Sequence, residues 1–187
     1  TYGPNREEIK INPGVNTYIT YAILPFVEVM FRYSHELNVP VNMETRYFPD
    51  RMLGFRLKVL DENKHLQSVV FGLQDASAIF GSTSQGATNY SAPYFVFSKK
   101  ISTSYGEFDW SIGYAFDFFS VIAKDFKGIF GGVMFTPQAL DKLSFVFENN
   151  SKGFNTGFKI NPIEPINLMF GLWDLKKPTI SINYVFY

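Results

Sequence analysis

In the run Phe108-Asp109-Trp110-Ser111-Ile112-Gly113-Tyr114-Ala115-Phe116-Asp117, five large apolar side chains alternate with small or acidic ones. Strict alternation with period two indicates a β-strand whose two faces meet different surroundings. Ten residues is also the length that a tilted membrane strand needs, about 9 to 11 residues. This run therefore predicts a strand of a transmembrane β-barrel.

The same alternation continues along most of the chain. It predicts eleven strands: Val15 to Leu24, Phe26 to His35, Met52 to Leu60, Gln67 to Asp75, Ala92 to Ile101, Phe108 to Asp117, Gly128 to Phe135, Lys142 to Glu148, Phe154 to Ile160, Ile166 to Asp174 and Thr179 to Tyr187. The connections between them alternate between short and long, which is typical of outer-membrane barrels with short periplasmic turns and longer outer loops. We expect a single domain over residues 1–187.

Eleven is an odd number of strands, whereas bacterial outer-membrane barrels have an even number. We therefore expect one more strand at the N-terminus. Residues 5–12 include the alternating run Glu7-Glu8-Ile9-Lys10-Ile11-Asn12, and Asn12-Pro13-Gly14 is a good turn. The expected fold is thus an all-β, closed, antiparallel, up-and-down transmembrane barrel of twelve strands. Ten strands, with a looser N-terminal segment, is the alternative.

Composition narrows the function classes. Charged residues make up 18% of the 187 residues, whereas Phe and Tyr number 21 and 11. The 17 basic and 17 acidic residues cancel, which argues against nucleic acid as a partner. The chain has no cysteine, so disulfides and thiolate metal sites are excluded. No apolar run reaches the roughly 18 to 20 residues of a membrane-spanning helix.

The faces opposite the bulky side chains carry Gly, Ala, Ser and Asn with single charges, not the Lys and Glu of a solvated surface. Small barrels fill their interiors with such mixed side chains. We expect an interior polar network in which five acidic and five basic residues offset one another. Its members are Glu8, Lys10, Glu28, Arg32, Arg56, Lys58, Asp109, Asp117, Glu148 and Lys159. A structural role is favoured for them, and ligand binding or ion conduction is the alternative.

The chain ends in an alternating strand rich in apolar and aromatic residues. Ile182, Tyr184 and Phe186 share its outward face, and Tyr187 lies one step beyond. A terminal aromatic strand is what the outer-membrane assembly machinery recognises, so these four residues are the predicted assembly signal. The alternative is the last strand of a soluble sheet, because aromatic residues favour strands in any case.

Several motifs resemble those of the YjbH-like outer-membrane proteins. They are the run from Tyr21 to Tyr33 with its Leu24-Pro25-Phe26 turn, Asp50-Arg51 followed by Phe55-Arg56-Leu57-Lys58, Phe71-Gly72-Leu73-Gln74-Asp75, Ser98-Lys99-Lys100 with Gly106-Glu107-Phe108-Asp109, and Phe130-Gly131-Gly132-Val133. The resemblance is taken to extend over about residues 15 to 187. The resemblance implies an outer-membrane location and an association with exopolysaccharide or capsule production. The chain departs from the family pattern at Gln74, where Arg is usual.

No enzyme signature is found. The two histidines, His35 and His65, lack the nucleophile and orienting acid of a triad, and no G-x-S-x-G or phosphate-loop motif occurs. We expect no catalytic residues, no metal and no cofactor.

Three functions remain open: a transport or assembly barrel serving surface-polysaccharide export or a larger outer-membrane complex, a plugged membrane scaffold, and a soluble lipocalin-like lipid-binding barrel. For the first two, the expected location is the outer membrane of a Gram-negative cell. The expected partners there are outer-membrane lipid, the assembly machinery and partner membrane proteins.

Overall fold

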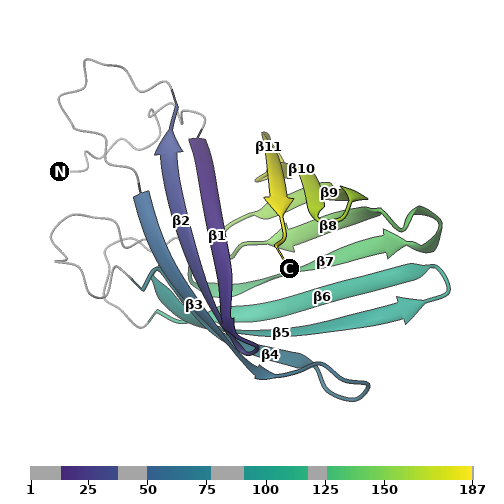
Figure 1. Cartoon of the computed structure of the whole chain (residues 1–187), viewed down its shortest axis with the longest axis horizontal. Helices are drawn as coiled ribbons and strands as arrows, with labels where there is room; N and C mark the ends of the chain where they lie inside the picture. Colours follow the sequence, from purple (N-terminus) through teal and green to yellow (C-terminus); the bar gives the residue numbers. More distant parts are fainter. Residues whose placement is uncertain (1–13, 38–49, 77–90, 118–125, 187) are drawn as a thin grey trace, which may run out of the picture.

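The computed structural model describes residues 14–37, 50–76, 91–117 and 126–186, which form one antiparallel sheet (Figure 1). Each strand pairs with the next along the chain. The strands are β1 (Gly14–Leu24), β2 (Val27–Glu36), β3 (Asp50–Leu60), β4 (Ser68–Gln74), β5 (Ala92–Thr103), β6 (Gly106–Ala115), β7 (Gly128–Pro137), β8 (Leu143–Asn149), β9 (Phe154–Ile163), β10 (Ile166–Trp173) and β11 (Lys177–Tyr184). Among the described residues, no helix is long and apolar enough to cross a membrane.

The all-β, up-and-down architecture predicted from the alternation is confirmed, and each of the eleven predicted strands has its counterpart. The predicted closure into a barrel is not. Within the described part of the chain, β1 pairs only with β2 and β11 only with β10, so the sheet stays open between its two edges. The predicted additional strand in residues 5–12, which would raise the count to twelve, lies outside the described residues.

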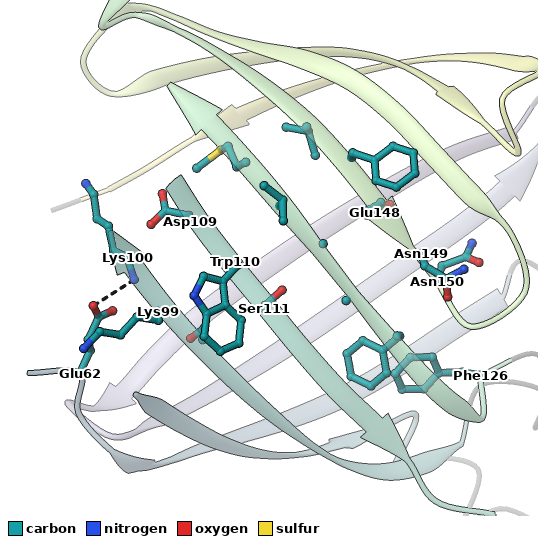
Figure 2. A pocket seen from close by; sticks show the side chains of 18 residues that line it. Glu62, Lys99, Lys100, Asp109, Trp110, Ser111, Phe126, Glu148, Asn149 and Asn150 are labelled. Carbon is teal, nitrogen blue, oxygen red and sulfur yellow. Dashed lines mark hydrogen bonds between the residues drawn. The ribbon is translucent and has the colours of Figure 1, made fainter. Parts of the chain in front are cut away.

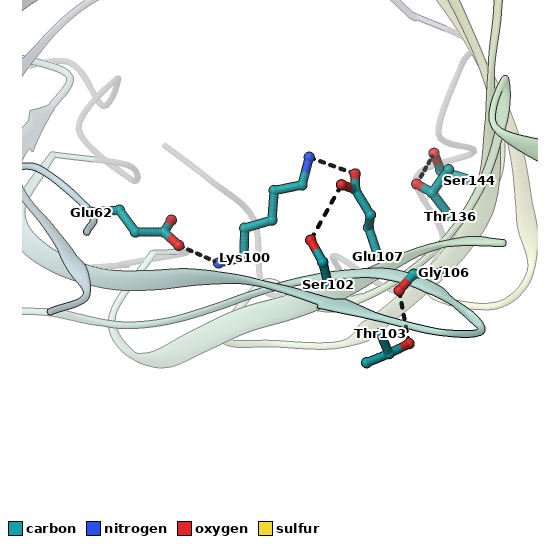
Figure 3. Close-up of polar contacts among 8 residues, drawn as sticks. All are labelled: Glu62, Lys100, Ser102, Thr103, Gly106, Glu107, Thr136 and Ser144. Carbon is teal, nitrogen blue, oxygen red and sulfur yellow. Dashed lines mark hydrogen bonds and ion pairs between the residues drawn. The ribbon is translucent and has the colours of Figure 1, made fainter. Parts of the chain in front are cut away.

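The sheet is strongly curved. Figure 1 shows its middle strands, β4 to β6, at the bottom of the view and both edges above them. Side chains of the two faces therefore meet different spaces: a hollow on the concave side and the surroundings on the convex side. Figure 3 shows Lys100, Ser102 and Glu107 pointing into the hollow, whereas Thr103 lies on the opposite face.

The strand register carries this division across the sheet. On the convex face, aromatic residues face aromatic or branched residues, as in Phe97 opposite Ile112 and Phe108 opposite Phe135. On the concave face, small and polar residues meet, as in Ser98 opposite Ser111 and Gly132 opposite Glu148. Period-two sequences place all side chains of one kind on one face only if the register is kept. Here it is kept from β5 to β9.

The two ends of the sheet differ in their connections. One end carries short turns: residues 25–26, 61–67, 104–105, 138–142 and 164–165. The other end carries the segments 37–49, 75–91 and 116–127 together with two short connections. We call these the short-turn end and the long-loop end. This asymmetry is the one predicted from the sequence.

The β3–β4 turn is held by a set of polar contacts. The Asn63 Oδ1 atom accepts hydrogen bonds from the backbone N–H groups of His65 and Leu66, each at 2.9 Å. The Lys99 ammonium donates to the carbonyl oxygens of Asn63 at 2.6 Å and Leu66 at 3.1 Å. Glu62 accepts from the backbone N–H of Lys100 at 3.0 Å. Turn residues thus cover the part of β5 that extends past β4.

Candidate functional site in the hollow of the sheet

Near the short-turn end, the concave face carries a group of ionic and hydroxyl side chains (Figure 3). The Lys100 ammonium and the Glu107 carboxylate, from adjacent strands, are 2.5 Å apart. Ser102 donates to the same carboxylate at 3.5 Å. Asp109 lies opposite Lys100 in the register of β5 and β6. The hairpin β5–β6 therefore presents one cation between two carboxylates.

Further along the same face, polar groups from other strands pair locally. The hydroxyls of Thr136 and Ser144 are 2.7 Å apart. The Glu148 carboxylate accepts from the Asn155 amide nitrogen at 2.8 Å, and the Asn155 oxygen accepts from the backbone N–H of Asp174 at 2.9 Å. Asn155 is buried, so its amide links β8, β9 and the end of β10 where little water reaches it.

An aromatic cluster occupies the concave side near the long-loop end. The ring of Tyr94 lies 5.7 Å from that of Phe126 and 5.8 Å from that of Phe130, and the two phenyl rings are 4.8 Å apart. The cluster fits because its neighbours are glycines. A Cβ at Gly72 would lie 2.0 Å from the Tyr94 ring, and one at Gly113 would lie 2.4 Å from the Phe130 ring. Tyr94 is only 6% exposed, which makes it the best-buried ring in the described hollow.

A cavity of about 530 Å³ lies in the hollow. Side chains of the ionic group and of the aromatic cluster both line it. Figure 2 shows Lys100 and Asp109 on one side of it and Phe126, Glu148 and Asn150 on the other. Small residues, including Ser111 and Gly132, line the wall between them. The volume falls within the range of small-molecule sites, roughly 300 to 1,000 Å³.

The register places seven of the ten predicted interior residues on the concave face: Glu28, Arg32, Arg56, Lys58, Asp109, Glu148 and Lys159. Glu28 and Arg56 pair at 3.5 Å, and Lys58 pairs with Asp61 at 2.6 Å. Lys159 lies opposite Ser144. Asp117 follows β6 and is exposed, and Glu8 and Lys10 lie outside the described residues. The ionic pairs that Glu28, Arg56 and Lys58 form thus involve other residues than the Lys100–Glu107 pair.

Sequence reasoning missed Lys100, Glu107 and Asn155. In Ser98-Lys99-Lys100 both faces of the strand are polar, so the alternation does not show which of these side chains lies on the inner face. Counting from Val96 and Ser98, which share the concave face, would have assigned Lys100 to it. Glu107 stands within the β5–β6 turn expected from the sequence, whereas the structure extends β6 to include it.

The predicted assembly-signal strand is the edge strand β11. Ile182 and Tyr184 lie on the convex face, 72% and 55% exposed, and Phe186 follows the strand at 87% exposure. Tyr187 lies outside the described residues. Three of the four predicted side chains are therefore available for contact with another surface.

Neither histidine is among the residues that line the cavity. His35 lies opposite Val15 in the register of β1 and β2, and His65 lies in the β3–β4 turn. In the described ranges, no group of three or more His, Asp or Glu side chains is placed to hold a metal ion.

Comparison with known proteins gives one result. The model of the YjbH family, described as exopolysaccharide biosynthesis protein YbjH, matches residues 8–123. No curated protein and no solved structure matches. The match includes the motifs from Tyr21 to Asp109 quoted above, and the run Phe130-Gly131-Gly132-Val133 lies beyond it. Because the family model matches more than half of the chain, the chain belongs to the YjbH family of exopolysaccharide biosynthesis proteins.

Proposed function

We propose that this chain is an outer-membrane β-barrel of a Gram-negative cell that serves the export of a surface polysaccharide. The observation that carries the proposal is the division of the sheet into an apolar convex face and a polar concave face. Family membership supplies the connection to exopolysaccharide. The difference between the two faces supports the location in a membrane.

The convex face carries an extensive array of exposed apolar side chains. Ile112, Tyr114, Ile129 and Phe147 are each close to half exposed or more. Monomeric soluble proteins rarely expose contiguous apolar patches above a few hundred Å². If lipid hydrocarbon covered this face, the apolar side chains would no longer be exposed to water, because lipid tails are apolar as well. The charged pairs meanwhile stay on the concave face, as a lumen requires.

Closure of the barrel is part of the proposal. With eleven strands in up-and-down order, β1 and β11 both run toward the short-turn end. A direct pairing of the two would be parallel, whereas bacterial single-chain barrels are antiparallel and even-numbered. One more strand between them restores antiparallel pairing on both sides. Residues 5–12, with their alternating pattern, are the proposed twelfth strand.

The lipocalin-like alternative requires the large aromatic side chains to point inward toward a lipid ligand. The register instead places Phe95, Phe97 and Phe108 on the convex face. This arrangement favours the membrane barrel. The aromatic cluster around Tyr94 is the exception, and it is confined to the long-loop end.

Because the chain has no cysteine, single-cysteine variants report position without interference. Ser111 and Ile112 are neighbours on opposite faces of β6. In proteoliposomes, Ile112→Cys should react with a lipid-soluble maleimide and resist a charged, membrane-impermeant one. Ser111→Cys should show the reverse preference if the hollow contains water. Rapid reaction of both variants with the charged reagent would contradict a membrane-embedded convex face.

The polysaccharide role is tested in the source organism. A strain lacking the chain should release less surface polysaccharide, and wild-type protein should restore it. Conductance of the purified protein in a planar bilayer then separates an open export pore from a plugged scaffold. We expect no catalysis, so His35→Ala and His65→Ala should complement the strain fully.

A further inference from the structure

We infer that the cavity in the hollow binds a short segment of an uncharged oligosaccharide. This inference deepens the proposed function and rests on it. It assigns a ligand class to a defined set of side chains: the aromatic rings of Phe126 and Phe130, and the polar groups of Asp109, Glu148 and Asn150.

The two kinds of lining match the two surfaces of a sugar ring. A pyranose has an apolar face of C–H groups and a rim of hydroxyls, and each hydroxyl both donates and accepts a hydrogen bond. Phe126 and Phe130 supply aromatic surface at 4.8 Å from one another, and Tyr94 supports them from behind the cavity lining. Aromatic side chains offer a large rigid surface for such contacts.

The polar side chains supply acceptors and donors for hydroxyls. The Oε1 atom of Glu148 accepts from Asn155, whereas its Oε2 atom accepts no hydrogen bond from the described residues. The Asn150 Oδ1 atom accepts from the backbone N–H groups of Lys152 and Gly153 at 3.1 and 2.9 Å, which leaves its NH₂ group as the donor for a ligand. Asp109 supplies further acceptors on the opposite side (Figure 2).

The charge of the lining favours a neutral ligand. Both lysines of the lining are already engaged: Lys99 by carbonyl oxygens of the β3–β4 turn and Lys100 by Glu107. A uronic acid entering the cavity would meet the carboxylates of Asp109 and Glu148, and the Lys100 cation beside Asp109 is already paired with Glu107, so the added negative charge costs affinity. A neutral sugar meets the same carboxylates as hydrogen-bond acceptors.

The test is calorimetric titration of the full chain in lauryldimethylamine oxide micelles, because that detergent has no sugar headgroup to compete. The probes are cellohexaose and maltohexaose, both neutral, and hexagalacturonate, which is anionic. We expect at least one neutral probe to bind and the anionic probe to bind more weakly. Absence of binding by both neutral probes, or preference for hexagalacturonate, overturns the inference.

Variants separate stacking from general packing. Phe126→Leu and Phe130→Leu keep apolar volume but lose the ring, and each should weaken binding about tenfold. Phe126→Tyr keeps the ring and should bind like wild type. The matched control is Phe158→Leu, which removes a ring from the convex stack with Phe170 at 5.2 Å and should leave binding unchanged. Full binding by both leucine variants overturns the assignment.

Failure of the site and failure of the proposed function are distinguishable. Normal polysaccharide release by the strain lacking the chain, together with neutral-probe binding by the protein, refutes the export role and leaves the site. Reduced release without binding refutes the site and leaves the role.

Discussion

At the scale of single residues, glycine sets how closely neighbouring strands approach on the concave face. A Cβ at Gly157 would lie 2.3 Å from the carbonyl oxygen of Phe170 and 2.9 Å from the Cα atom of Gly171. Both are backbone atoms, so they cannot turn aside as a side-chain end could. A methyl group at this position therefore forces β9 and β10 apart.

We predict that Gly157→Ala lowers the free energy of unfolding by about 1 to 3 kcal/mol, the usual cost of overpacking. Urea unfolding of the refolded protein in micelles measures it. Gly54→Ala is the control, because its closest atom is the flexible end of Met30 at 3.2 Å. Equal stability of the two variants would refute the close-approach explanation.

At the scale of elements, the β3–β4 turn depends on two side chains, those of Asn63 and Lys99, which form hydrogen bonds with the backbone groups of the turn. Asn63→Ala leaves the N–H groups of His65 and Leu66 without their acceptor. Lys99→Met removes the donor to the carbonyl oxygens of Asn63 and Leu66. We expect each variant to lose about 1 kcal/mol of stability, since the freed groups remain near water.

Proteolysis of the folded protein offers a local measurement, with cleavage after Lys64 rising in both variants. Gln138→Ala, in the short 3-10 helix Gln138–Leu140 between β7 and β8, provides the control at the same end of the sheet. Cleavage after Lys64 that stays at the wild-type rate in Asn63→Ala would contradict the role assigned to its side chain.

The edge strand β11 carries a second prediction at this scale. Replacing Tyr184 and Phe186 together by Ser removes two exposed aromatic side chains. If the strand is the signal read by the assembly machinery, the double variant should accumulate outside the membrane fraction while refolding normally in micelles. Ile180→Ser, at a position that is 71% exposed and lies earlier in the strand, is the comparison.

At the scale of the whole molecule, the prediction concerns closure. A closed barrel resists unfolding by dodecyl sulfate at room temperature and changes its gel mobility on heating. We expect the full chain to do so and a variant lacking residues 1–12 to lose this behaviour, because β1 and β11 would then have only a parallel pairing available. Retention of heat-modifiable mobility by the shortened chain would assign closure to another segment.

The strands were predictable because a two-residue period leaves a clear signature wherever one face is apolar, as from Phe108 to Asp117. The pairing of Lys100 with Glu107 was not, since Ser98-Lys99-Lys100 is polar on both faces and the extension of β6 into the turn depends on tertiary pairing. The aromatic cluster could not be predicted from the sequence either. Tyr94 lies in β5, whereas Phe126 and Phe130 lie just before and within β7, and only the register shows that Gly72 and Gly113 make room for the rings of Tyr94 and Phe130.

The separation of rings and charges along the hollow has one more consequence. Tyr94, Phe126 and Phe130 stand toward the long-loop mouth, and Lys100, Glu107 and Asp109 toward the short-turn mouth. In a closed barrel, a solute arriving from one mouth would shed water against phenyl surface first, whereas one arriving from the other would first exchange its hydration for ionic contacts. The contacts that a solute meets first would then differ between the two directions, although a passage without an energy source cannot by itself favour net movement in either of them.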